Sequence, residues 1–202
     1  MTRRELRFWI PATFALGLAA IGCESGGVGD PCIPEDEYQA DFAGYGIGEV
    51  NIESRSFQCE TRLCLVNHFE GRVSCPYGQP DRRTDEARTA AAGDERVCYL
   101  PDQEQTEAFQ VSVPVAPQRF ARQAEDAVYC SCRCKGPDEN ARYCECPDGY
   151  SCLELVGDYG LAGGQLQGSY CVRKGTKYNP RDSYPEVCDE MATEECGPAD
   201  GR

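Results

Sequence analysis

Residues 129–134 read Tyr-Cys-Ser-Cys-Arg-Cys, and residues 143–146 read Tyr-Cys-Glu-Cys. Alternate residues of a β-strand point to the same face, so each stretch predicts a strand with its sulfur atoms on one side. The segment from Lys135 to Arg142 contains Gly-Pro-Asp, a combination typical of turns. The two stretches therefore predict a cysteine-rich β-hairpin.

The spacing of these cysteines leaves their bonding open. In a hairpin that places Cys134 opposite Cys144, the same register places Cys132 opposite Cys146. Direct cross-strand disulfides are then possible. Threaded bonding to other strands fits the same spacing equally well.

The chain contains 15 cysteines in 202 residues, an odd number, whereas disulfides use cysteines in pairs. Leu, Ile, Val and Phe number only 27 in the 180 residues after position 22, a share below the level of about 20% expected for a conventional core. Disulfides contribute roughly 2–4 kcal/mol each, so several of them can replace that core. We therefore expect a small disulfide-rich fold of mostly β-hairpins and coil with little helix. The disulfide candidates are Cys32, Cys59, Cys64, Cys75, Cys98, Cys130, Cys132, Cys134, Cys144, Cys146, Cys152, Cys171, Cys188 and Cys196.

Residues 1–22 have the pattern of an export signal, with three arginines followed by an uncharged run from Phe8. This run is shorter than the roughly 20 apolar residues of a transmembrane helix. Its end, Ala19-Ala20-Ile21-Gly22-Cys23, resembles the lipobox of bacterial lipoproteins. The resemblance implies that residues 1–22 are removed and that Cys23 carries acyl chains, which accounts for the odd cysteine. An ordinary secretory signal cleaved near Ala19 or Ala20 is the alternative.

The lipoprotein interpretation predicts a lipid bilayer as one partner, because two or three acyl chains hold a protein stably on a membrane. Residues 23–31 contain three glycines and one proline, so we expect a flexible lipidated tether. Glu24 follows the lipidated cysteine, and by resemblance to enterobacterial sorting it favours the outer membrane of a Gram-negative bacterium.

A cysteine-free segment divides the remaining cysteines into groups of four and ten. We expect a first cysteine-rich module at residues 32–78, an exposed linker at 79–97 and a second module at 98–202. The even counts allow the first four cysteines to close two bridges among themselves, although three connectivities are possible. Within the linker, Thr84 or Asp85 can cap a short helix that Gly93 ends.

Further patterns concern the two expected modules. Residues 59–75 and 146–171 form a loose repeat, each with a Cys-Leu pair followed by a glycine and a cysteine, although coincidence explains it as well. Residues 144–152 weakly resemble the end of an epidermal-growth-factor-like module. Residues 109–115 predict a strand and residues 117–127 a short helix.

Composition excludes some functions. The net charge of −14 becomes −16 once residues 1–22 are removed, and so acidic a chain lacks the positive surface that nucleic acids require. Closely spaced cysteines also occur in metal-thiolate clusters. Exported thiolates are normally oxidised, however, so we expect disulfides, no metal and no other cofactor.

No residue pattern identifies a catalytic group. His68 is the only histidine and has no recognisable nucleophile nearby in sequence, so we expect a surface or turn histidine. Pairs of carboxylates can cleave glycosides, but the sequence singles out no pair. The acidic groups at 138–140 and 189–195 lack the pattern of a twelve-residue calcium loop.

These observations predict a lipid-anchored envelope protein at the cell surface or in the periplasm. We expect a non-enzymatic binding or interaction module, with an unknown protein or glycan as its partner. An envelope hydrolase acting through carboxylates and a structural envelope protein are the alternatives.

Overall fold

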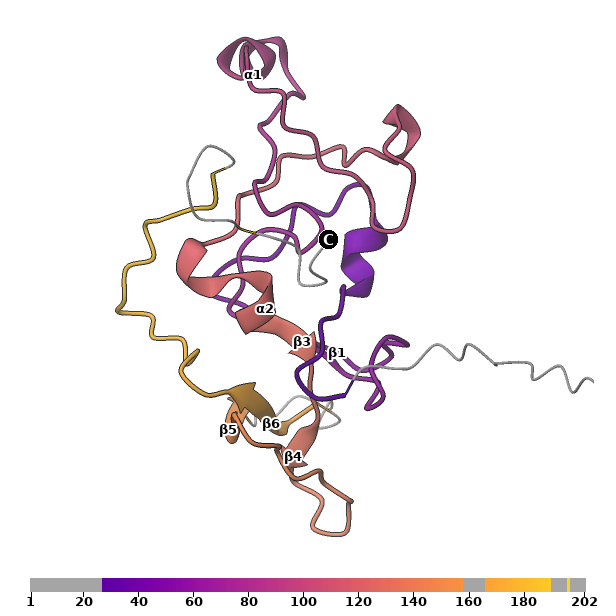
Figure 1. The fold of residues 1–202 in the computed structure, drawn as a ribbon, viewed down its shortest axis with the longest axis vertical. Helices are drawn as coiled ribbons and strands as arrows, with labels where there is room; N and C mark the ends of the chain where they lie inside the picture. Colours follow the sequence, from indigo (N-terminus) through magenta and orange to yellow (C-terminus); the bar gives the residue numbers. More distant parts are fainter. Residues whose placement is uncertain (1–26, 158–165, 190–195, 197–202) are drawn as a thin grey trace, which may run out of the picture.

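The computed structural model describes residues 27–157, 166–189 and 196. Two three-stranded antiparallel sheets, short helices and long coil segments make up this part of the chain (Figure 1). The expected small, disulfide-rich, mostly β and coil fold is confirmed. The elements in order are η1 (Glu35–Tyr38), β1 (Val50–Glu53), β2 (Cys64–Asn67), α1 (Asp85–Ala90), η2 (Glu107–Phe109), η3 (Phe120–Arg122), α2 (Ala124–Ala127), β3 (Val128–Cys130), β4 (Arg133–Lys135), β5 (Tyr150–Val156) and β6 (Gly168–Arg173).

Strand β2 forms the centre of the first sheet, where it pairs with β1 on one side and β3 on the other. Its four residues, Cys-Leu-Val-Asn, are all buried. Successive residues of a strand point to opposite faces, so Cys64 and Val66 face one way and Leu65 the other. The two faces accordingly contribute to different clusters of buried side chains.

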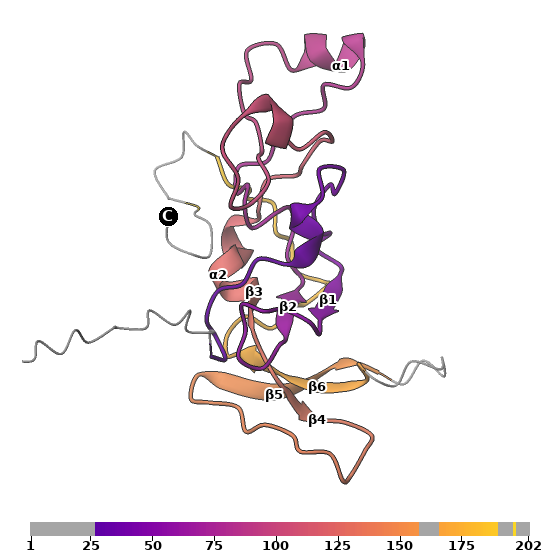
Figure 2. The same cartoon turned by 90° about the vertical axis from the view of Figure 1, so that its right-hand side faces the viewer.

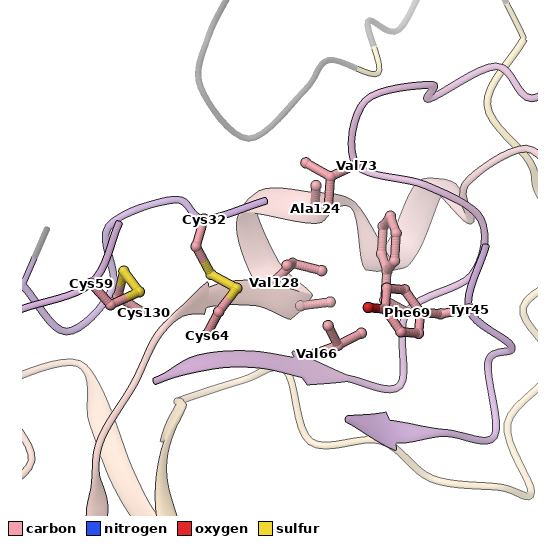
Figure 3. Close-up of a cluster of buried hydrophobic side chains, with 11 residues drawn as sticks. Cys32, Tyr45, Cys59, Cys64, Val66, Phe69, Val73, Ala124, Val128 and Cys130 are labelled. Atoms are coloured by element: carbon pink, nitrogen blue, oxygen red, sulfur yellow. A yellow bond between two sulfur atoms is a disulfide. The ribbon is translucent and has the colours of Figure 1, made fainter. Parts of the chain in front are cut away.

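One face of this sheet packs with helix α2 around a mixed core of aliphatic, aromatic and sulfur-containing side chains. Val66, Phe69 and Val128 pack in it, and the disulfides Cys32–Cys64 and Cys59–Cys130 lie at its side (Figure 3). Disulfide sulfur therefore takes the place of aliphatic side chains that the sequence lacks.

The opposite face joins the first sheet to the second, whose strand order is β4-β6-β5 (Figure 2). Leu65 and Tyr129 pack against Tyr170 and Val172 of β6. The Tyr129 hydroxyl also accepts a hydrogen bond of 2.9 Å from the backbone N–H of Arg173. The contact between the sheets is therefore both apolar and directional.

A third, smaller cluster lies in the segment that carries α1, and it contains Val111, Val115 and the Cys75–Cys98 disulfide. Gln79 organises this segment, because its side-chain amide donates to the Val111 carbonyl at 2.9 Å and its carbonyl accepts from Cys98 N–H at 2.7 Å. Helix α1 itself buries no residue. Thr84 caps it as expected by accepting a hydrogen bond from the Ala87 N–H.

Seven disulfides pair all fourteen candidate cysteines. They are Cys32–Cys64, Cys59–Cys130, Cys75–Cys98, Cys132–Cys144, Cys134–Cys152, Cys146–Cys171 and Cys188–Cys196. Such a number of disulfides indicates an oxidising, extracytoplasmic location. Among the residues that the structure describes, no helix has the length and apolar character needed to cross a bilayer.

The expected hairpin between residues 129–134 and 143–146 is wrong. The first stretch is divided between β3 and β4, and the second is not a strand. Strand β4 pairs with β6, so the threaded alternative holds and Cys132, Cys134 and Cys146 bond outside the hairpin register. The sequence could not reveal this because β6 lies more than thirty residues further along the chain.

The structure also bears on the predicted strand, the predicted helix and the loose repeat. Residues 109–115 form no strand and make only isolated bridges at Gln110 and Val115. Residues 117–127 contain η3 and α2, two short helical turns separated by Gln123. The two halves of the loose repeat fold differently, because Cys152 lies opposite Cys171 whereas Cys64 lies opposite Cys130.

Two disulfides connect the regions on either side of the expected linker. Cys59–Cys130 and Cys75–Cys98 both join residues 32–78 to residues beyond 97, so the first four cysteines do not close two bridges among themselves. The sheet β1-β2-β3 likewise draws strands from both regions. The first core is therefore shared between the two expected modules.

The end of the expected tether is bound to the sheet. Gly29 N–H donates to the Cys130 carbonyl, and Cys130 N–H donates to the Asp30 carbonyl, both at 2.8 Å. Gly29 has φ +102, and a Cβ there would lie 2.3 Å from the Tyr150 hydroxyl. Glycine suits this position because side chains rarely adopt such a positive φ.

Candidate binding site

The structure accounts for the sequence-predicted site residues as follows. Cys23 lies outside the described residues. The fourteen disulfide candidates form seven pairs with one another. Of the acidic groups, Asp138 accepts a hydrogen bond from the Asn140 N–H and so stabilises a turn. Residues 190–195 lie outside the described part of the chain.

Several sulfur atoms approach one another closely. The groups are Cys32, Cys59 and Cys130; Cys132, Cys144 and Cys171; and Cys134, Cys146 and Cys152, each within 4.8 Å. Every one of these sulfurs belongs to a disulfide and so is not a thiolate, the form that binds soft metals. The proximity reflects packing of one disulfide against the next.

His68 holds the C-terminal arm, residues 174–188, against the first sheet. Its ring stacks on Tyr178 with centroids 3.9 Å apart, and its Nδ1–H donates to the Ile47 carbonyl at 3.1 Å. Burial and the neighbouring Arg122 guanidinium lower the pKa of His68 below 6.5. The ring is therefore neutral at pH 7, and its contacts are those of a packing residue.

A buried ion pair fixes η1 against the turn at residues 71–74. Glu37 and Arg72 are both fully buried, with 3.9 Å between Glu37 Oε2 and Arg72 Nε. The Glu37 carboxylate accepts hydrogen bonds from Val73 N–H at 2.6 Å and from the N–H and hydroxyl of Ser74 at 2.9 and 2.7 Å. The Arg72 guanidinium donates to the backbone carbonyls of Glu37, Gln39 and Phe42. Helix η1 thereby forms a rigid wall.

A groove of about 720 Å³ lies between this wall and the loop that follows β1. Ile33, Glu35 and Tyr38 line one side of it. Residues 53–58 and Arg62 line the other. We call this feature the η1 groove.

Hydrogen bonds hold the two sides of the η1 groove together. Ile33 N–H donates to Gln58 Oε1 at 2.9 Å, and Gln58 Nε2 donates back to the Ile33 carbonyl at 2.8 Å. Glu35 N–H donates to Glu53 Oε2 at 3.0 Å. The Cys32–Cys64 and Cys59–Cys130 disulfides fix the chain next to both sides. Hydrogen bonds and disulfides therefore hold both sides of the groove in place.

The lining of the η1 groove carries charges of both signs: Glu35, Glu53, Arg55 and Arg62. Partial burial, together with Glu35 and Asp36 nearby, raises the pKa of Glu53. Within the described residues neither Arg55 nor Arg62 forms an ion pair. Both guanidinium groups can therefore pair with an external anion.

The loop side of the groove presents an unusual combination of an exposed ring and a buried hydroxyl. Phe57 is 83% exposed, and the Arg62 guanidinium lies 4.8 Å from its ring centroid. Ser56 is only 2% exposed, yet its hydroxyl has no hydrogen-bond partner among the described residues. A buried hydroxyl without a partner is energetically costly, so Ser56 is a locally unfavourable feature of this loop.

Sequence reasoning did not identify this groove. The available signal was Ser54-Arg55-Ser56-Phe57-Gln58, where an aromatic residue stands without apolar neighbours and so is expected to be exposed. No known protein family, curated protein or solved structure matches the chain.

Proposed function

We propose that the chain is an exported envelope lipoprotein, anchored to a membrane by acyl chains on Cys23. The observation that supports the proposal most directly is the complete pairing of the other fourteen cysteines in seven disulfides. Cys23 is the odd cysteine of the fifteen, and the residues before it resemble a lipobox. Acylation of Cys23 would account for the one cysteine that is left over when the other fourteen are paired.

We further propose that the ectodomain acts by binding, through the η1 groove, and not by catalysis. An exposed aromatic ring and two guanidinium groups that form no ion pair within the described part of the chain are groups that recognise a ligand. An envelope protein or glycan is the expected partner of the surfaces that point away from the anchor. The outer membrane of a Gram-negative bacterium is the expected site of attachment.

Mass spectrometry of the intact mature protein, before and after reduction, tests the anchor. The expected protein begins at Cys23, carries the mass of its acyl groups and gains fourteen hydrogens on reduction of seven disulfides. The Cys23→Ala variant should leave the membrane fraction and lose lipid labelling. A variant that fractionates with membranes like the wild type would contradict the proposal.

A carboxylate hydrolase is the second candidate, favoured by one observation. Glu35 and Glu53 line the same groove, and the environment of Glu53 raises its pKa, as in enzymes whose carboxyl groups divide acid and base roles. Hydrolysis of envelope polysaccharides or peptides by the purified protein would support this candidate if Glu53→Gln abolished it. Retained activity in that variant would exclude Glu53 as the acid or base.

A further inference from the structure

The η1 groove lies directly beside the first described residues of the chain. Ile33 lines the groove and exchanges two hydrogen bonds with Gln58 of the opposite side. In Figure 1 these first residues, drawn in indigo, run next to the loop that follows β1, and α1 lies at one end of the long axis. Figure 2 shows α1 at the same extreme from a second direction.

The position of Cys23 in the sequence limits how far this groove can be from a bilayer. Gly29 is hydrogen-bonded to Cys130 of β3, so the chain is fixed from that residue onward. Only six residue steps separate Cys23 from Gly29, and they span at most about 20 Å when fully extended. If acyl chains hold Cys23 in the membrane, the groove is held close to the headgroup layer.

The chemistry of the groove matches a headgroup that carries both charges. Arg55 and Arg62 offer guanidinium groups that form no ion pair with any described residue, and guanidinium groups bind phosphate oxygens well. Glu35 and Glu53 offer carboxylates to a cationic amine. Phe57 exposes an apolar aromatic ring of the kind that inserts at the boundary between lipid headgroups and acyl chains.

We propose that the η1 groove binds zwitterionic phospholipid headgroups of the membrane that holds Cys23, with Phe57 inserted among them. Phosphate meets Arg55 and Arg62, and the amine meets Glu35 and Glu53. This inference rests on the proposed lipid anchor. It gives the protein a second, non-covalent membrane contact, which fixes its orientation on the bilayer.

A zwitterionic surface fits better than an anionic one. The chain without residues 1–22 has a net charge of −16, and a negative surface potential repels such a protein. The mixed lining of the groove offsets little of that repulsion, because its two arginines are matched by two glutamates. A neutral headgroup with separated charges avoids the repulsion and satisfies both pairs.

Tryptophan fluorescence tests this contact, because Trp9 is the only tryptophan and lies in the segment that the proposal removes. Phe57→Trp should therefore report from the groove alone, at a residue exposed enough to replace without disturbing the core. The lipid-bearing variant is reconstituted into vesicles of phosphatidylcholine and phosphatidylethanolamine, with and without bromine on the acyl chains. The matched control is Ala90→Trp, in exposed helix α1.

The expected result for the Phe57→Trp variant is a blue-shifted emission and quenching by brominated lipid several-fold stronger than for the Ala90→Trp variant. Adding Arg55→Gln and Arg62→Gln should reduce that quenching, as should replacement of half the lipid by phosphatidylglycerol. Equal, weak quenching in both variants, in a protein whose mass shows the acyl groups, would overturn the groove proposal and leave the anchor standing. A protein without acyl groups would overturn the anchor and this inference with it.

Discussion

Replacing Arg72 by methionine tests whether the buried ion pair holds the wall of the η1 groove. The substitution keeps most of the apolar stem but removes a fully buried guanidinium that donates to three backbone carbonyls. Glu37 would then remain buried without its cation. Removing one partner of a buried pair typically costs about 3–5 kcal/mol, a large part of the 5–15 kcal/mol that stabilises most domains.

The assay is guanidinium unfolding with the disulfides intact, followed by circular dichroism. The control is Arg88→Met, since Arg88 forms an exposed ion pair with Asp85 on α1. Exposed pairs contribute roughly 0.2–1 kcal/mol, so the control should unfold near the wild-type midpoint. Equal midpoints for the two variants would refute the assigned role of Arg72.

The pH dependence of the Arg72→Met variant provides a second readout. Burial raises the pKa of Glu37 above 4.5 in the folded wild type, and loss of Arg72 removes an influence that lowers it. The folded variant then keeps a proton that the unfolded chain releases above pH 4.5. By linkage its stability falls as pH rises through the raised folded pKa. The deficit relative to wild type should therefore be smaller at pH 4.5 than at pH 7.

Three further predictions concern other parts of the chain. The folded pKa of His68 lies below 6.5, so the folded protein should lose stability as pH falls below 6.5. The His68→Asn variant should not show that loss. An NMR titration that gives this single histidine a pKa of 6.5 or higher would contradict the prediction. In thermal unfolding, Gly71→Ala should destabilise the protein by about 1–3 kcal/mol more than Gly93→Ala. Both glycines have positive φ, but of the two only Gly71 has a backbone oxygen, 2.4 Å away, where a Cβ would be. Equal melting temperatures for the two variants would refute the clash. Trypsin should cut at exposed Arg88, and the fragments should separate on gels only after reduction, because both Cys59–Cys130 and Cys75–Cys98 span the cut. Separation without reduction would exclude both disulfides.

The sequence was sufficient for the fold class because the deciding quantities are counts. Few aliphatic residues and many cysteines require a disulfide-supported fold, whatever the path of the chain. The cap of α1 was also predictable, since Thr84 acts within three residues of its partner. Both predictions depend on composition or on local contacts.

The disulfide connectivity depends instead on contacts that are distant in sequence. Strand β4 pairs with β6, and Cys64 faces Cys130 across β2 and β3 without bonding to it. Alternation in residues 129–134 correctly indicates extended chain, but it carries no information about which strand lies beside it. The η1 groove could not be predicted from the sequence either, because Ile33 and Gln58 come together only in the folded chain.

The same distant contacts explain how a chain with a weak core would hold the η1 groove next to the proposed membrane anchor. Gly29 and Asp30 bond to β3, Cys32 is linked to β2, and Cys59 is linked to β3. Three successive attachments therefore fix the first described residues and the groove loop to the same sheet. A force on a lipidated Cys23 would be carried into these bonds within about ten residues, before it reached the apolar contacts. If Cys23 is lipidated as proposed, a protein with few aliphatic side chains gains from disulfides near its anchored end, which is where two of the seven lie.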